Sequence, residues 1–153
     1  CAQCSADLRY NARACGMPVD LRKYFPGVYK ELGFKISVEN SGDALARLRL
    51  RFSEFEESSR LISLSVKKIR GSVSAAVQPE VKAGSGLGFA EGWRGPVLYW
   101  LKIDSAGLIE RCKVVDPSFL NWQGLSYAVL GDILPDFPLC NKSFDLSYSG
   151  NDL

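Results

Sequence analysis

Residues 41–71 read SGDALARLRLRFSEFEESSRLISLSVKKIRG, and this stretch decides the fold class. Seven apolar residues and one serine recur in it at spacings of three and four: Leu45, Leu48, Phe52, Phe55, Ser59, Ile62, Val66 and Ile69. That period predicts one long amphipathic α-helix, with Ser41 or Asp43 as N-cap, Lys67, Lys68 and Arg70 at its C-terminal end and Gly71 ending it. We call this set of eight residues the apolar stripe. Because Ser59 interrupts it and no second such helix follows, we expect it to pack inside a helical bundle rather than in a coiled coil.

Shorter signals flank this helix on both sides. Short helical segments are expected within residues 3–25, with a break at Gly16 and Pro18, then a turn at Pro26–Gly27 and a short strand over 34–38. The glycine-rich residues 84–88 lack the Lys-Ser/Thr or strand context of a phosphate-binding loop, so residues 72–92 are interpreted as a connector.

The second half of the chain predicts a β-hairpin and a further helix. Residues 97–103 and 108–115 are rich in strand-forming residues, and the four residues between them end in Gly107, which suits a positive φ. Asn121 is expected to cap a helix that ends at Gly131, and residues 132–153 show no clear periodicity. The sequence therefore predicts an α+β fold.

Composition narrows the range of functions. The 153 residues are 46% hydrophobic, which is enough for one globular domain with its own core. Nineteen basic and seventeen acidic residues leave a net charge of +2, which disfavours nucleic acid as a partner. No apolar run is long enough to span a bilayer and no secretion signal is present, so we expect a cytoplasmic protein. The absence of histidine removes the commonest metal ligand and general base.

The five cysteines permit a metal or redox interpretation without favouring it. Cys1 and Cys4 have the spacing of a zinc, iron–sulfur or dithiol half-site, and Cys15 could add a ligand. Because neither a second pair nor a histidine completes the set, we expect reduced thiols without a metal or redox role.

A compact polar cluster precedes the expected hairpin. Residues 91–95 read EGWRG, and Asp116 follows the hairpin at its other end. A tight hairpin would bring Glu91, Arg94 and Asp116 together. Two interpretations remain open: an ion-pair network that pins a loop, or an Arg94 guanidinium that binds an anionic group or lies beside a redox centre, with Glu91 orienting it.

Several of these stretches together carry a family resemblance. They are EGWRGPVLYWLKI at 91–103, DPSFLNWQGL at 116–125, GDILPDFPL at 131–139 and, upstream, ARACGMPVDLR at 12–22 with Gly42–Arg47 and Arg60–Ile62. In this order they resemble the C-terminal part of the large subunit of energy-converting (group 4, formate hydrogenlyase-type) [NiFe] hydrogenases. They are also similar to the homologous large peripheral-arm subunit of respiratory NADH:quinone oxidoreductase.

The resemblance implies a fold, a context and partners. It implies a [NiFe]-hydrogenase large-subunit-like fold in which residues 1–153 form the C-terminal portion of a subunit about three times as long, consistent with the start at Cys1. Residues 1–90 would form a helical part with a connector, and residues 91–153 the hairpin, a C-terminal helix and the tail. The implied partners are an iron–sulfur small subunit and, indirectly, membrane subunits, at the inner face of the cell membrane.

The tail departs from the hydrogenase pattern. Metal-bearing relatives end in D-P-C-x-x-C, whose two thiolates hold nickel and iron, whereas Ser147 and Gly150 occupy those positions here. We therefore expect no NiFe site, no cofactor bound by this chain, and a candidate acceptor pocket formed by Glu91, Arg94, Asp145, Ser147, Gly150 and Asp152. The expected function is electron transfer, to quinone by analogy with the respiratory relatives, and the alternative is a non-catalytic scaffold subunit. Either way, the isolated chain is expected to be inactive.

Overall fold

The computed structural model describes residues 9–69, 71 and 81–152 of the chain. Its helices are α1 (Arg9–Ala14), α2 (Leu21–Tyr24), α3 (Gly27–Glu31), α4 (Ala44–Lys68), α5 (Pro117–Ala128), α6 (Phe137–Phe144) and α7 (Tyr148–Asn151), with a 3₁₀ turn at Leu134–Asp136. Three strands, β1 (Gly84–Gly92), β2 (Gly95–Ile103) and β3 (Ile109–Val115), form one antiparallel sheet in the order β1-β2-β3. This arrangement is the expected α+β fold.

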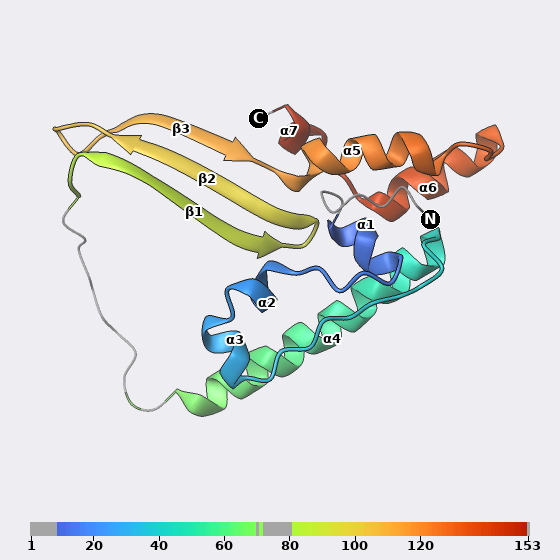
Figure 1. Cartoon of the computed structure of the whole chain (residues 1–153), viewed down its shortest axis with the longest axis horizontal. Helices are drawn as coiled ribbons and strands as arrows, with labels where there is room; N and C mark the ends of the chain where they lie inside the picture. The colour runs from blue at the N-terminus through green and yellow to red at the C-terminus, as the bar shows by residue number, and fades with distance from the viewer. Residues whose placement is uncertain (1–8, 70, 72–80, 153) are drawn as a thin grey trace.

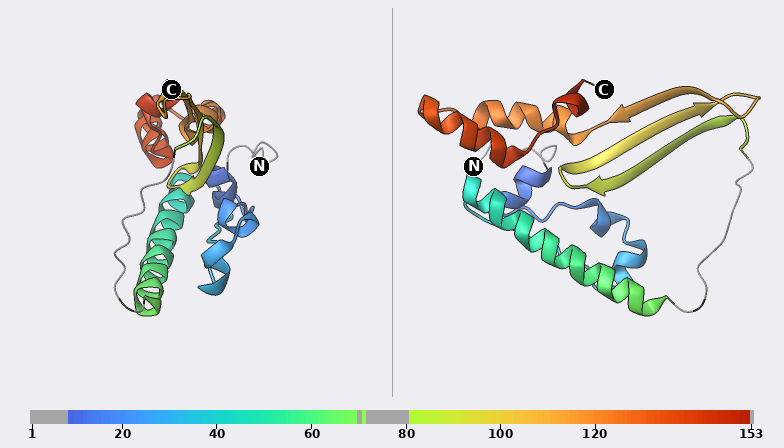
Figure 2. Two further views of the ribbon diagram at one scale, coloured as in Figure 1. Left: turned by 90° about the vertical axis from the view of Figure 1, so that its left-hand side faces the viewer. Right: turned by 180° about the vertical axis from the view of Figure 1, so that it is seen from behind.

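The long helix and the sheet enclose the N-terminal helices (Figure 1). The segment from α1 to α3 lies between α4 and β1, and α5, α6 and α7 gather at one end of the sheet, near the beginning of α4. Figure 2 shows the same grouping from two further sides. Among the described residues, no helix has both the length and the apolar character needed to cross a membrane.

The predicted helix over 45–69 is confirmed as α4. Asp43 rather than Ser41 is its N-cap, because the Asp43 carboxylate accepts a hydrogen bond from the Ala46 N–H at 2.7 Å. The helix ends at Lys68, and Gly71 beyond it has φ +82°, a conformation that glycine adopts without strain.

The orientation of α4 differs from the expectation that its apolar stripe packs inward. The large apolar side chains of the stripe are half or more exposed, from 50% at Leu45 and Leu48 to 64% at Phe52, Phe55 and Ile62. The opposite face is buried against the rest of the described chain through Ala46, Arg47, Leu50 and Leu61, and hydrogen bonds add to this contact. Arg47 donates to the Ser143 Oγ and the Gly42 carbonyl, Arg60 donates to the Leu32 and Gly33 carbonyls, and Glu57 accepts from the Lys35 N–H. Burying polar side chains is tolerated here because they find partners.

Two predicted local structures near α3 are wrong. Residues 34–38 are extended but form no strand, because no neighbouring strand in the described part of the chain pairs with them; instead the Glu57 side chain of α4 accepts the Lys35 N–H. Pro26 and Gly27 do not make an isolated turn but begin the short helix α3. Proline suits that position because it has no N–H to leave unpaired.

The sheet confirms one prediction and corrects another. The hairpin of β2 and β3 turns at residues 104–108, where Gly107 has φ +79° and the Asp104 carboxylate accepts two backbone N–H bonds. Residues 84–92, expected to belong to a connector, form β1 instead, because their backbone pairs in full register with β2. Residues 72–80 lie outside the described part of the chain.

The C-terminal region is more helical than the sequence suggests. Helix α5 begins after Asp116, whose carboxylate accepts the Ser118 N–H at 2.8 Å, and not at the predicted cap Asn121. Pro117 at the first helical position explains the earlier start. Helices α6 and α7 are too short for a periodic signal. Cys140 and Phe144 of α6 form a small apolar core with Leu125 of α5.

Candidate functional site

Arg94 lies in the tight turn that joins β1 to β2. The turn packs against the start of α5, so closely that a Cβ on Gly95, which has φ +130°, would lie 3.2 Å from the Pro117 side chain. The Arg94 carbonyl accepts a hydrogen bond at 2.9 Å from the side chain of Asn121, which is buried in α5. The base of the Arg94 side chain is therefore held on two sides.

The Asp145 carboxylate lies between two guanidinium groups. Its Oδ2 atom is 3.1 Å from Arg51 Nη1 and 3.6 Å from Arg94 Nη2, and Arg94 Nε also donates to the Asp145 carbonyl. Asp145 ends α6 with φ +53°, the one positive φ at a non-glycine position among the described residues. Both guanidinium groups are therefore positioned by one partly exposed carboxylate.

Sequence reasoning misses Arg51. The alternation Arg47-Leu-Arg-Leu-Arg51 indicates only an ambiguity between helix and strand. On α4, Arg51 also donates to the Phe144 carbonyl at 3.2 Å and stacks on Trp93, with its Cζ atom 5.1 Å from the ring centroid. Because Trp93 precedes Arg94 in the turn between β1 and β2, Arg51 links α4, that turn and the end of α6.

The two tail positions of interest, Ser147 and Gly150, lie beside Asp116. Ser147 is the N-cap of α7: its Oγ accepts the Gly150 N–H at 3.0 Å, and its own N–H donates to the Ser118 Oγ at 3.0 Å. Gly150 is buried, and a Cβ there would lie 2.6 Å from the Asp116 Cγ atom. The Asp116 carboxylate thus fills the space into which any side chain at position 150 would point. We call Arg51, Arg94, Asp116, Asp145, Ser147 and Gly150 together the tail site.

The tail site does not fit a thiolate-bound bimetallic centre. Ser147 offers one hydroxyl already engaged as a cap, and Gly150 offers no side chain at all. Within the described part of the chain, no group of three His, Cys, Asp or Glu side chains is placed to hold a metal ion. A nickel–iron centre of the hydrogenase type is held by thiolates, which these positions lack.

Adding a methyl group at position 150 tests this packing. We expect Gly150→Ala to lower the free energy of unfolding by about 1–3 kcal/mol, because the new Cβ must displace the Asp116 carboxylate. Gly88→Ala, where nothing lies within 4 Å of the new Cβ, should stay within about 0.5 kcal/mol. In urea titrations, Asp116→Ala should remove most of the Gly150→Ala effect, and strict additivity of the two changes would contradict this packing.

Glu91 belongs to a different cluster from Arg94. It is 2% exposed; its Oε1 accepts from Arg13 Nη1 and its Oε2 from the Leu21 N–H, each at 3.1 Å. Arg13 also pairs with Asp20 at 3.1 Å and with Glu54 at 2.9 Å, and Asp20 pairs with Arg22 at 2.7 Å. The five residues Arg13, Asp20, Arg22, Glu54 and Glu91 form the buried ion-pair cluster. The expectation that Glu91 orients Arg94 by direct contact is therefore wrong, because the fold brings Arg13 on α1 against the Glu91 carboxylate.

The buried ion-pair cluster holds three carboxylates and two guanidinium groups. Burial raises the pKa of Glu54 above its ordinary value of 4.5, against the opposing charges of Arg13 and Arg22. The Glu54–Arg13 ion pair lacks the alignment of a hydrogen bond, which is consistent with this direction.

The raised pKa of Glu54 gives a pH dependence of defined sign. A carboxyl whose folded pKa is raised stabilises the fold fully below its unfolded pKa, near 4.5, and less as pH rises through the folded value. We expect stability to decline less steeply from pH 4.5 upward in Glu54→Gln than in the parent chain, as measured by thermal unfolding across pH. Parallel curves for the two proteins would contradict the assignment.

The remaining candidate residues are Asp152 and the cysteines. Asp152 is exposed at the end of α7, where it accepts a hydrogen bond from Asn151 at 3.3 Å. Cys140 is a buried thiol whose pKa is raised by burial, Cys15 is partly exposed and Cys112 is exposed. Cys1 and Cys4 lie outside the described residues. The structure brings Arg94, Asp145, Ser147 and Gly150 into one region, and places Glu91 in the buried cluster.

The amino-acid sequence of this chain is similar to those of subunits of respiratory and hydrogenase complexes. Residues 9–83 match the family model of the respiratory-chain NADH dehydrogenase 49 kDa subunit. An NADH-quinone oxidoreductase subunit of Syntrophobacter fumaroxidans is 37% identical over 141 residues, covering 89% of this chain and 38% of the relative. The carbon monoxide-induced hydrogenase of Rhodospirillum rubrum is 32% identical over 136 residues, covering 88% and 38%.

A solved structure has the same fold. It is that of the membrane-bound sulfane sulfur reductase, an archaeal respiratory membrane complex, with a TM-score of 0.79 and 26% identity over 94% of this chain and 42% of that one. The long helix α4, the β1–β2 turn that carries Arg94 and the helical tail thus define a domain of the large-subunit type found in respiratory membrane complexes. Residues 9–83 thus match the family of the 49 kDa subunit of NADH dehydrogenase, and most of the chain is similar to its NADH dehydrogenase and hydrogenase relatives. It spans about 38% of the length of the relatives it matches.

Proposed function

We propose that this chain is the C-terminal domain of the large subunit of a membrane-associated oxidoreductase complex, and that it contributes to electron transfer to quinone or a quinone-like acceptor. The observation that carries the proposal is the pair of guanidinium groups, Arg51 and Arg94, held on Asp145 two residues before Ser147. In the proposed complex, an iron–sulfur small subunit supplies the electrons and membrane subunits hold the assembly at the cytoplasmic face of the membrane.

The proposed role of the two arginines is electrostatic. An acceptor that takes up electrons gains negative charge, and fixed positive groups in a partly dry site stabilise that charge without reorganising. Arg94 is prepared for this role because its backbone is held by Asn121 and its guanidinium by Asp145. We propose no nickel–iron site in the tail, since Ser147 and Gly150 stand where thiolates are required.

Substituting Arg94 in the intact complex tests the proposal. We expect Arg94→Ala to lower turnover by about 10²-fold, with normal subunit stoichiometry, because a preorganised charge is lost. Arg94→Lys should retain part of the activity, and Lys102→Ala on the exposed sheet should retain all of it. Stoichiometric nickel bound through this tail, or full turnover without Arg94, would overturn the proposal.

A second candidate function is that of a scaffold without catalysis, and the exposed apolar stripe of α4 favours it. Seven large apolar side chains on one helix face form a surface of the kind that marks interaction sites. We propose that a second amphipathic helix covers this stripe, supplied by the subunit length that the relatives have beyond this chain. Loss of assembly in Arg94→Ala, rather than loss of turnover alone, would support the scaffold function.

A further inference from the structure

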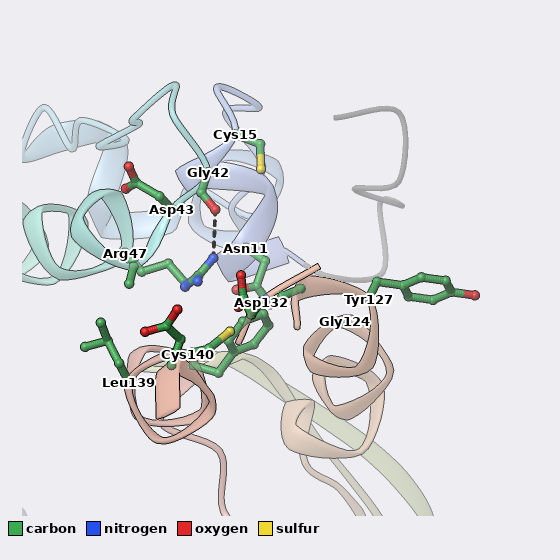
Figure 3. A pocket seen from close by; sticks show the side chains of 14 residues that line it. Asn11, Cys15, Gly42, Asp43, Arg47, Gly124, Tyr127, Asp132, Leu139 and Cys140 are labelled. Atoms are coloured by element: carbon green, nitrogen blue, oxygen red, sulfur yellow. Dashed lines mark hydrogen bonds between the residues drawn. The ribbon is translucent and has the colours of Figure 1, made fainter. Parts of the chain in front are cut away.

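A cavity that shares no lining residue with the tail site lies beside α6. It has a volume of about 570 Å³ and lies between α1, the first turn of α4, α5 and α6. Figure 3 shows Asn11, Arg47, Asp132 and Cys140 around this space, contributed by segments far apart in the sequence. None of the tail-site residues lines it.

The cavity contains an unpaired buried amide. Asn11 is 6% exposed, and among the described residues neither its side-chain oxygen nor its nitrogen has a hydrogen-bond partner. Buried polar groups are nearly always paired, so an orphaned carboxamide that faces a cavity indicates a missing partner. A carboxamide presents one acceptor and two donors in a plane, which match the N–H and C=O of a peptide group.

The mouth of the cavity carries an excess of negative charge. Three exposed carboxylates, Asp43, Asp132 and Asp136, line it together with one guanidinium, that of Arg47. Arg47 already donates to the Gly42 carbonyl and the Ser143 Oγ, and its Cζ atom lies 4.5 Å from the centre of the Phe144 ring. The mouth therefore favours a cationic group.

The walls between the amide and the mouth are largely apolar. They include Ala44, Ala128, Leu139 and Phe144. Such a wall suits the aliphatic stem of a lysine or arginine, which packs on apolar surface while its charge stays near water.

We propose that this cavity binds an extended peptide segment that carries a lysine or arginine. The peptide group hydrogen-bonds to the Asn11 carboxamide, the aliphatic stem lies along Leu139 and Phe144, and the cationic end meets Asp132 and Asp136. This assignment is independent of electron transfer, because it uses none of the tail-site residues.

A capped tripeptide provides a defined probe. We expect acetyl-Ala-Lys-Ala-amide to bind the ¹⁵N-labelled chain at millimolar concentration and to shift the Asn11 side-chain amide resonances. The peptide with norleucine in place of lysine should bind about tenfold more weakly, since it lacks the charge-assisted contacts. Asp132→Asn with Asp136→Asn should weaken the lysine peptide by a similar factor, whereas Glu110→Gln on β3 should leave it unchanged.

Three results would overturn the proposal. Equal binding of the lysine and norleucine peptides would show that the carboxylates at the mouth do not bind the cationic group. If n-butylamine binds as tightly as the peptide, the cavity binds small cations and makes no contact with a peptide group. Unchanged Asn11 side-chain resonances at a saturating peptide concentration would show that the peptide does not contact the Asn11 carboxamide. The carboxylate variants lie at the exposed mouth, so the test does not depend on an Asn11 substitution that could unfold the chain.

Discussion

Replacing Arg13 by leucine is expected to lower the free energy of unfolding by about 3–5 kcal/mol, the largest stability effect we predict. Arg13 is 1% exposed and contacts three carboxylates, those of Asp20, Glu54 and Glu91. Leucine would leave these carboxylates with only the Arg22 guanidinium of the cluster for compensation. Removing one partner of a buried ion pair is costly because the other charge stays buried.

Urea denaturation of the 153-residue chain measures this effect, with Lys102→Met as the matched control. Lys102 pairs with Glu110 at 2.7 Å, but both side chains are about half exposed, so its loss should cost about 0–1 kcal/mol. The Arg13 effect should shrink in a variant that also carries Glu54→Gln and Glu91→Gln, because fewer charges are then stranded. A cost for Arg13→Leu no larger than that of the control would show that the cluster does not stabilise the fold.

Phe55→Asp is expected to leave the stability of the 153-residue chain nearly unchanged but to prevent assembly of the full-length subunit. Phe55 is 64% exposed, so the 153-residue chain should change in stability by no more than about 0.5 kcal/mol. If a second helix covers the apolar stripe, the full-length subunit loses about 1.5–3 kcal/mol of apolar burial and must also bury a carboxylate. We therefore expect its assembly into the complex to fail.

The matched control is Ser105→Asp, which adds the same charge at an exposed position in the β2–β3 turn, away from α4. Native gels of the complex should show normal assembly for Ser105→Asp and none for Phe55→Asp. Normal assembly of Phe55→Asp would refute the proposed covering helix. If instead the 153-residue chain is a dimer that Phe55→Asp converts to monomer, a second copy covers the stripe.

Some features of the candidate site are predictable from the sequence and others are not. The tail residues Asp145, Ser147 and Gly150 and the hairpin residue Arg94 are recognisable from motifs, and the fold places them in one region. Arg51 escapes such reasoning, because its partners Asp145 and Phe144 are more than ninety positions away in the sequence. The sequence predicts the wrong partner for Glu91, because Arg94 is only three residues away whereas the actual partner, Arg13, is distant in the sequence.

The sequence by itself determined part of the local structure of this protein. Periodicity predicts α4, Asp43 offers its cap and Gly107 its hairpin turn, since these depend on hydrogen bonds and backbone angles within a few residues. Only the tertiary structure decided which face of α4 meets the chain, that residues 84–92 pair as a strand, and which carboxylate each arginine binds. Those outcomes depend on the relative positions of distant elements, because a buried charge is stabilised by whichever opposite charge the fold brings within reach.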